Sequence, residues 1–144
     1  MPAAQRAFLP DHILSAVLTL AKQELGKAEQ NPKRLAFRSH DFQLQEIFSE
    51  LQKTKNYPIL DAFVFSDDGP EPYSPALNES VSRLQLSGLI GRENPDYEVV
   101  FLRPAADRFY DEVLRTEFSD SQRRELAEIA SQFLKRITVV QDPS

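Results

Sequence analysis

The chain has 144 residues and a net charge of −5, with 41% hydrophobic and 27% charged residues. This size and composition suit one globular domain with a single core, and they exclude wholesale disorder. No run approaches the roughly 18 consecutive apolar residues of a membrane span, so we expect no membrane association. The chain contains no Cys, which excludes disulfides and thiolate metal sites and fits a cytoplasmic location.

The charge is distributed unevenly along the chain. Residues 1–38 hold six Lys or Arg against three Asp or Glu, whereas residues 60–76 hold four acids and no base. This asymmetry indicates either a charged surface that binds a partner or an ordinary solvated surface. Both interpretations stay open.

The first third of the sequence predicts two helices. Apolar residues at helical spacing indicate a helix over Asp11–Leu25 that ends at Gly26. Its apolar face is wide enough to contact more than one neighbour. Residues 27–38 are predicted to form a basic connector, after which Ser39 caps a second helix that ends near Thr54. The apolar face of this second helix comprises Leu44, Ile47, Phe48 and Leu51.

The middle of the chain predicts a strand, a loop and a helix. The β-branched and aromatic run Ile59–Phe65 indicates a strand, and the Pro- and Gly-rich residues 66–72 indicate a loop. Ser74 and Pro75 then mark a helix start, with Ser at the N-cap and Pro at the first helical position. This helix should end at Gly88. Its predicted buried stripe comprises Leu77, Val81 and Leu84.

A hairpin and two further helices are predicted to complete the chain. Residues 89–93 and 97–102 flank Asn94–Asp96, a predicted hairpin tip. A fourth helix is expected over residues 104–117, with Ala106, Phe109, Tyr110, Val113 and Leu114 facing inward. Ser119 and Gln122 match a capping box for a fifth helix. The apolar stripe of this fifth helix comprises Leu126, Ile129, Ala130, Phe133 and Leu134. The apolar tail Ile137–Val140 is expected to add an edge strand or to meet a partner chain.

Together these elements predict a helix-rich α+β fold with a winged-helix-like core. In one domain of residues 1–144, an N-terminal helix (11–26) precedes the core with its small antiparallel sheet (39–103). Two C-terminal helices (104–136) follow. Winged helices mostly bind nucleic acid or proteins, although a fold does not fix a function.

The helix that begins at Pro75 is the candidate binding element. If its apolar stripe is buried, then Asn78, Ser82 and Gln85 face outward, where Asn and Gln can pair with adenine edges. Arg83, and Arg92 on the hairpin, are candidate guanine or phosphate contacts. Few Lys or Arg residues lie beside these positions in the sequence, which favours a contact with protein instead of DNA. A single surface carrying Arg38, Arg83 and Arg92 would favour DNA.

Part of the sequence resembles a known group of proteins. Residues 42–102 run from an apolar helix (FQLQEIFSELQK) through an aromatic segment (FVF) and a GPEPYS loop to a helix that ends in SGLI. This order is similar to that of the Panacea-type winged-helix proteins. The group includes prophage-associated and antitoxin-like regulators. The resemblance implies non-enzymatic regulation or neutralisation of a partner.

No residue pattern in the sequence indicates catalysis. His12 and His40 lack the spacing of metal ligands, and the acidic residues around Gly69 do not match a calcium-binding loop. Asp111 and Glu112 are adjacent on a helix and point in different directions. With four Gly in the chain, a phosphate-binding loop is not expected either. We therefore expect no enzyme, no cofactor and no metal site.

The expected function is that of a small bacterial or phage-type regulator or antitoxin-like protein that acts by binding. The first alternative is a protein-interaction module of the same fold without a nucleic-acid role. The second is a small-molecule sensor or enzyme with a pocket between the N-terminal helix and the sheet. The wide face of the first helix and the stripe of the fifth helix predict a homodimer.

Overall fold

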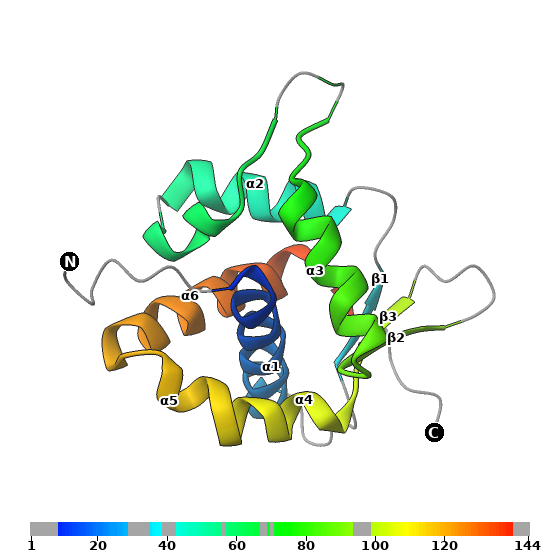
Figure 1. The fold of residues 1–144 in the computed structure, drawn as a ribbon, viewed down its shortest axis with the longest axis vertical. Helices are drawn as coiled ribbons and strands as arrows, with labels where there is room; N and C mark the ends of the chain where they lie inside the picture. Colours follow the sequence, from blue (N-terminus) through cyan, green and yellow to red (C-terminus); the bar gives the residue numbers. More distant parts are fainter. Residues whose placement is uncertain are drawn as a thin grey trace.

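The computed structural model describes residues 9–28, 35–38, 43–55, 57–66, 69, 71–93 and 99–139. Its sheet has the strand order β2–β3–β1–β4, and all neighbouring strands are antiparallel. The strands are β1 (Ala36–Arg38), β2 (Ile90–Glu93), β3 (Val99–Leu102) and β4 (Thr138–Val139). The sheet lies at one side of the molecule, and most of the helices lie at the other (Figure 1).

The elements confirm the predicted helix-rich α+β fold with a small antiparallel sheet. Helix α1 (Pro10–Ala28) precedes β1, and α2 (Gln43–Lys55) and α3 (Pro75–Leu86) precede the hairpin of β2 and β3. Strand β1 pairs with β3, so the hairpin is joined to the body of the sheet. Residues 56–74 connect α2 to α3, a connection far longer than the three or four residues of a helix-turn-helix motif.

Helix α1 lies in the middle of the molecule, between α6 (Asp120–Arg136), α3 and the helical residues 104–117 (Figure 1). Consecutive residues of α1 are buried because neighbours surround it: from Ile13 to Thr19, none is more than 2% exposed. This explains the wide apolar face seen in the sequence. The predicted end at Gly26 is wrong, because α1 continues to Ala28. Packing of the helix outweighs the roughly 1 kcal/mol that an interior Gly costs.

Helix α6 (Asp120–Arg136) packs directly against α1. Its predicted capping box is confirmed, because the Ser119 side chain accepts from the Gln122 backbone N–H and the Gln122 side chain accepts from the Ser119 N–H. The buried face comprises Leu126, Ile129, Ala130 and Phe133. The two apolar faces on which the homodimer prediction rested therefore cover each other within one chain.

The predicted strand over Ile59–Phe65 is wrong, since residues Pro58–Ala62 form a 3₁₀ helix, η2. Ile59, Leu60 and Phe63 are the buried residues of this run, which is a helical spacing and not the alternation of a strand. Pro58 presets the first turn. The Gln52 side chain then donates to the carbonyl oxygens of Leu60 and Phe63 at 2.9 and 2.8 Å, and this fixes the end of the turn.

Two short strands differ from the expected pattern. Strand β1 lies inside residues 27–38, which were predicted to be a connector; three residues are too few to show the period of a strand. The apolar tail does add an edge strand, as Thr138 and Val139 pair with Arg38 and Phe37 of β1. Ser39, His40 and the hairpin tip Asn94–Asp96 lie outside the described residues.

The fourth predicted helix contains a π-helical turn. Helix α4 (Pro104–Phe109), the turn η3 (Tyr110–Leu114) and α5 (Arg115–Glu117) follow one another without a break. The predicted extent of this helix is thus confirmed, but Val113 is 41% exposed instead of inward. A π turn holds more residues than an α turn, so the side chains within it, Val113 among them, depart from the α-helical phase.

Candidate partner-binding surface

The start of α3 is built as the sequence predicts. Ser74 is the N-cap, and its hydroxyl accepts a hydrogen bond from the Leu77 backbone N–H at 3.3 Å. Pro75 occupies the first turn, and Gly88 follows the helix with φ of +78°, a conformation that favours Gly. These local signals fix where the helix begins and ends.

A buried glutamine holds this end of α3 against α2. The Gln45 side-chain oxygen accepts from the Ser74 backbone N–H at 2.6 Å, and its amide nitrogen donates to the Ser74 carbonyl at 3.0 Å. Gln45 and Ser74 are both buried, so the amide replaces water for both backbone groups. Sequence reasoning missed this contact, because Gln45 looked like an ordinary polar residue of a helix.

The rotation of α3 about its axis agrees with the prediction. Leu77, Val81 and Leu84 are buried, whereas Asn78, Ser82 and Gln85 are exposed. Helix α3 packs mainly against α1. Leu86, at the end of the helix, is 87% exposed. We call Asn78, Ser82, Gln85 and Leu86 the α3 surface.

Arg83 is neutralised by carboxylates within the chain. Its Nε and Nη2 donate to the two carboxylate oxygens of Asp11 at 2.7 and 3.0 Å, and Nη1 lies 3.6 Å from Glu79. Ser80 also donates to Asp11, at 2.7 Å. Burial raises the pKa of Asp11, but the hydrogen bonds from Arg83 and Ser80 outweigh it and hold that pKa below its ordinary value. The hydrogen bond to Asp11 in turn raises the pKa of Arg83.

The sequence did not reveal the role of Asp11. It was predicted only as a favourable acid in the first turn of α1, and 72 residues separate it from Arg83. The pairing of Arg83 with Glu79 was the only one visible from local spacing.

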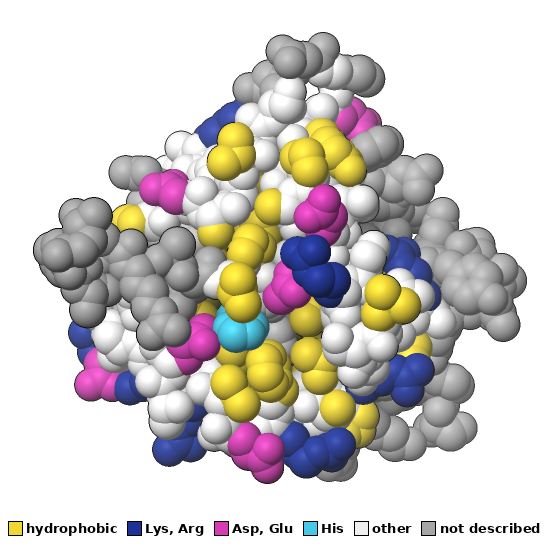
Figure 2. Space-filling model, viewed as in Figure 1, with side chains coloured by type: hydrophobic (Ala, Val, Ile, Leu, Met, Phe, Trp, Pro, Cys, Tyr) yellow, Lys and Arg dark blue, Asp and Glu magenta, His cyan; other side chains and the backbone are white. Residues whose placement is uncertain are grey.

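The three arginines that would have indicated DNA do not share one surface. In the sheet, Arg38 pairs with Val99, and Arg92 pairs with the next residue of β3, Val100. Val100 also pairs with Phe37, which is buried. Neighbouring residues of a strand point to opposite faces, so Arg38 and Arg92 project from opposite faces of the sheet. Arg92 is half-buried and has interactions within the chain. On the face shown in Figure 2, basic and acidic side chains of the described residues are interspersed.

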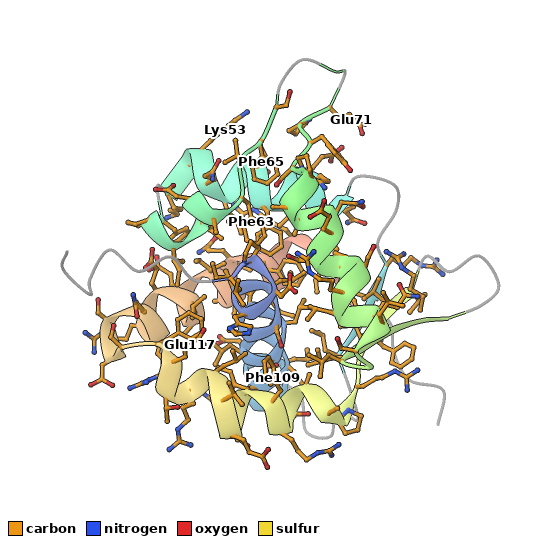
Figure 3. All side chains as sticks on the ribbon, viewed as in Figure 1. Lys53, Phe63, Phe65, Glu71, Phe109 and Glu117 are labelled. Carbon is orange, nitrogen blue, oxygen red and sulfur yellow. The ribbon has the colours of Figure 1, made fainter. Side chains whose placement is uncertain are left out.

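His12 connects α1 to the helical residues 104–117. Its Nδ1 lies 2.8 Å from the Glu117 carboxylate, and its ring meets the edge of Phe109. Phe109 is the last residue of α4 and Glu117 the last residue of α5, and both point toward α1 (Figure 3). Among the residues that the structure describes, no group of His, Asp and Glu is placed to hold a metal ion. No described helix is long and apolar enough to cross a bilayer.

Comparison with known proteins adds no relative: no protein-family model matches the sequence, and no curated protein or solved structure matches the chain.

Proposed function

We propose that this chain is a non-enzymatic binding protein that contacts a protein partner through the α3 surface. The observation that carries the proposal is the combination of outward polar side chains, an exposed Leu86 and a single base already paired with acids. Protein interfaces favour such surfaces, because their centres are depleted of charge and enriched in apolar contacts.

The pairing of Arg83 with acidic residues favours a protein partner over DNA. Phosphate contacts supply much of the affinity of DNA-binding proteins. For Arg83 to reach a phosphate, it would have to break a bidentate hydrogen bond with Asp11 and leave that carboxylate facing the DNA.

The test compares two exposed apolar residues. A partner is captured from the source cells with the tagged protein, and its affinity is then measured for the Leu86→Asp and Val64→Asp variants. Leu86 lies on the α3 surface; Val64, which is 74% exposed, lies outside it. We expect Leu86→Asp to weaken binding at least tenfold, about 1.4 kcal/mol, as expected of a residue central to an interface. Equal affinities for the two variants would contradict the proposal.

A second candidate, sequence-specific DNA binding, is favoured by one observation. Asn78, Ser82 and Gln85 are exposed on one side of α3, the arrangement in which a recognition helix reads base edges. Retention on random duplex at about 50 mM salt, with steep loss at higher salt, would support this candidate. No retention under that condition removes it.

The proposal includes a cytoplasmic location and a homodimer. The lack of Cys supports the location. The apolar faces of α1 and α6 pack against each other within the chain, so they do not supply a dimer interface. Sedimentation at high micromolar concentration tests it, and a monomer there would contradict it.

A further inference from the structure

A polar pocket lies between the C-terminal half of α1, the π turn and the start of α6. Its volume is about 400 Å³, within the range of small-molecule sites. Its lining residues are Gln23, Tyr110, Asp111, Arg115, Thr116 and Arg123. None of them belongs to the α3 surface.

The π turn gathers four of these residues. In an α-helix, residues five positions apart are rotated by about 140° from each other. Here the Arg115 backbone N–H donates to the Tyr110 carbonyl, an i to i+5 hydrogen bond, which closes a wider turn. Tyr110 and Arg115, and likewise Asp111 and Thr116, are thereby brought to one side of the helix. Such turns occur often at functional sites.

Two opposite charges in this pocket have no partner among the described residues. Asp111 and Arg115 are four positions apart, a spacing at which acids and bases commonly pair, but no ion pair joins them. Both are exposed. Arg123 differs, because it donates to the carbonyls of Arg115 and Phe118 and pairs with Asp120. The pocket therefore offers one available cation and one available anion.

Tyr110 adds a hydroxyl donor to the pocket. The residue is only 5% exposed, and its hydroxyl forms no hydrogen bond within the described part of the chain. Burial raises the pKa of Tyr110 although Arg123 and Arg115 act in the opposite direction, so the phenol keeps its proton at neutral pH. Around Arg115 the pocket is thus rich in donors, and at Asp111 it has an acceptor.

We propose that this pocket binds a small zwitterion of the α-amino acid class. Its carboxylate lies toward the Arg115 guanidinium and the Tyr110 hydroxyl, and its ammonium group lies toward Asp111. A ligand with both charges satisfies both unpaired side chains, whereas a simple anion faces repulsion from Asp111 and a simple amine faces repulsion from Arg115. The volume leaves room for a side chain on the ligand.

The test uses three probes that share one short carbon chain: L-alanine, propionate and ethylamine. Backbone amide chemical shifts of residues 110–116 are followed in the ¹⁵N-labelled full chain during each titration. We expect saturable shifts with L-alanine at a dissociation constant of about 10 mM or below, ordinary for so small a ligand. Propionate and ethylamine, each lacking one charge, should bind at least tenfold more weakly.

Matched variants locate the effect. Arg115→Gln should weaken L-alanine binding at least tenfold, and Asp111→Asn should weaken it while leaving propionate binding equal or stronger. Glu112→Gln and Arg108→Gln change exposed neighbours that do not line the pocket, so they should leave binding unchanged. Absence of saturable shifts with L-alanine up to about 50 mM, a concentration at which even weak specific sites of this size fill, overturns the proposal. Equal binding by Arg115→Gln and Arg108→Gln overturns it as well.

Discussion

Two hydroxyl groups in the interior of α1 have no hydrogen-bond partner among the residues that the structure describes. They belong to Ser15 and Thr19, which are at most 1% exposed. A buried hydroxyl without a partner loses its hydrogen bonds to water on folding and gains nothing in return. These residues lie where α1 is surrounded by other elements, so burying their hydroxyls lowers the free energy of unfolding.

Replacement of Thr19 by Val should therefore stabilise the protein. The substitution keeps the shape of the side chain and removes the unsatisfied group, and we expect a gain of about 1 kcal/mol in the free energy of unfolding. Urea denaturation measures it. Thr54→Val is the control, because Thr54 is exposed and donates to the Glu50 carbonyl. A loss of stability in Thr19→Val as large as that in the control would contradict the interpretation.

Asp11 should make stability depend on pH. Its folded-state pKa lies below its ordinary value of 3.8. Its contribution is therefore complete above about pH 5 and is lost as pH falls through the folded-state pKa. We expect Asp11→Asn to lower stability at pH 7 and to show less further loss on acidification than the wild type. Denaturation midpoints at a series of pH values measure this.

The control for Asp11 is Asp61→Asn, which changes an exposed carboxylate. It should leave the pH dependence as in the wild type. If the two variants show the same pH profile, Asp11 does not hold Arg83 in solution as it does here.

At the scale of elements, α3 depends on one side chain from α2. Gln45→Leu removes both hydrogen bonds to Ser74 and leaves the buried Ser74 N–H unpaired, whereas the Ser74 carbonyl keeps the hydrogen bond from the Asn78 backbone N–H. One unpaired buried group costs about 1–3 kcal/mol, so we expect a loss of that size in the free energy of unfolding. Guanidinium denaturation followed by circular dichroism measures the loss. Glu46→Gln, at the exposed neighbouring position, should change stability by less than about 0.5 kcal/mol.

Elements with signals in adjacent residues were predictable. Ser74 with Pro75, Gly88, and the pair Ser119 and Gln122 each fix a boundary through a local hydrogen bond or a local backbone preference. The rotation of α3 followed as well, because three apolar residues at helical spacing can be buried in only one orientation. These signals placed the exposed residues of the candidate surface correctly.

Features that depend on distant residues were not predictable. The 3₁₀ turn after Pro58 is held by Gln52, and the neutralisation of Arg83 depends on Asp11. The π turn left no mark in the apolar pattern, so Val113 was predicted to face inward. In each case, a tertiary contact or a local change of helical period replaced what propensity alone favours.

For the whole molecule, the position of α1 decides which surfaces remain for partners. Helix α1 packs against α6 and α3, so the widest apolar face of the sequence is used inside the chain. The outward side of α3, with its polar side chains and Leu86, remains exposed. A partner that binds there contacts a helix whose back is supported by the core.

Site-specific photo-cross-linking tests this account most directly. A photoreactive residue is placed at Ser82 on α3 and, in a separate protein, at Lys135, an exposed position of α6. We predict that the probe at position 82 gives a discrete protein adduct in the source cells and that the probe at position 135 does not. Cross-linking of nucleic acid instead of protein at position 82, or the same adducts from both positions, would contradict a protein-binding surface on α3.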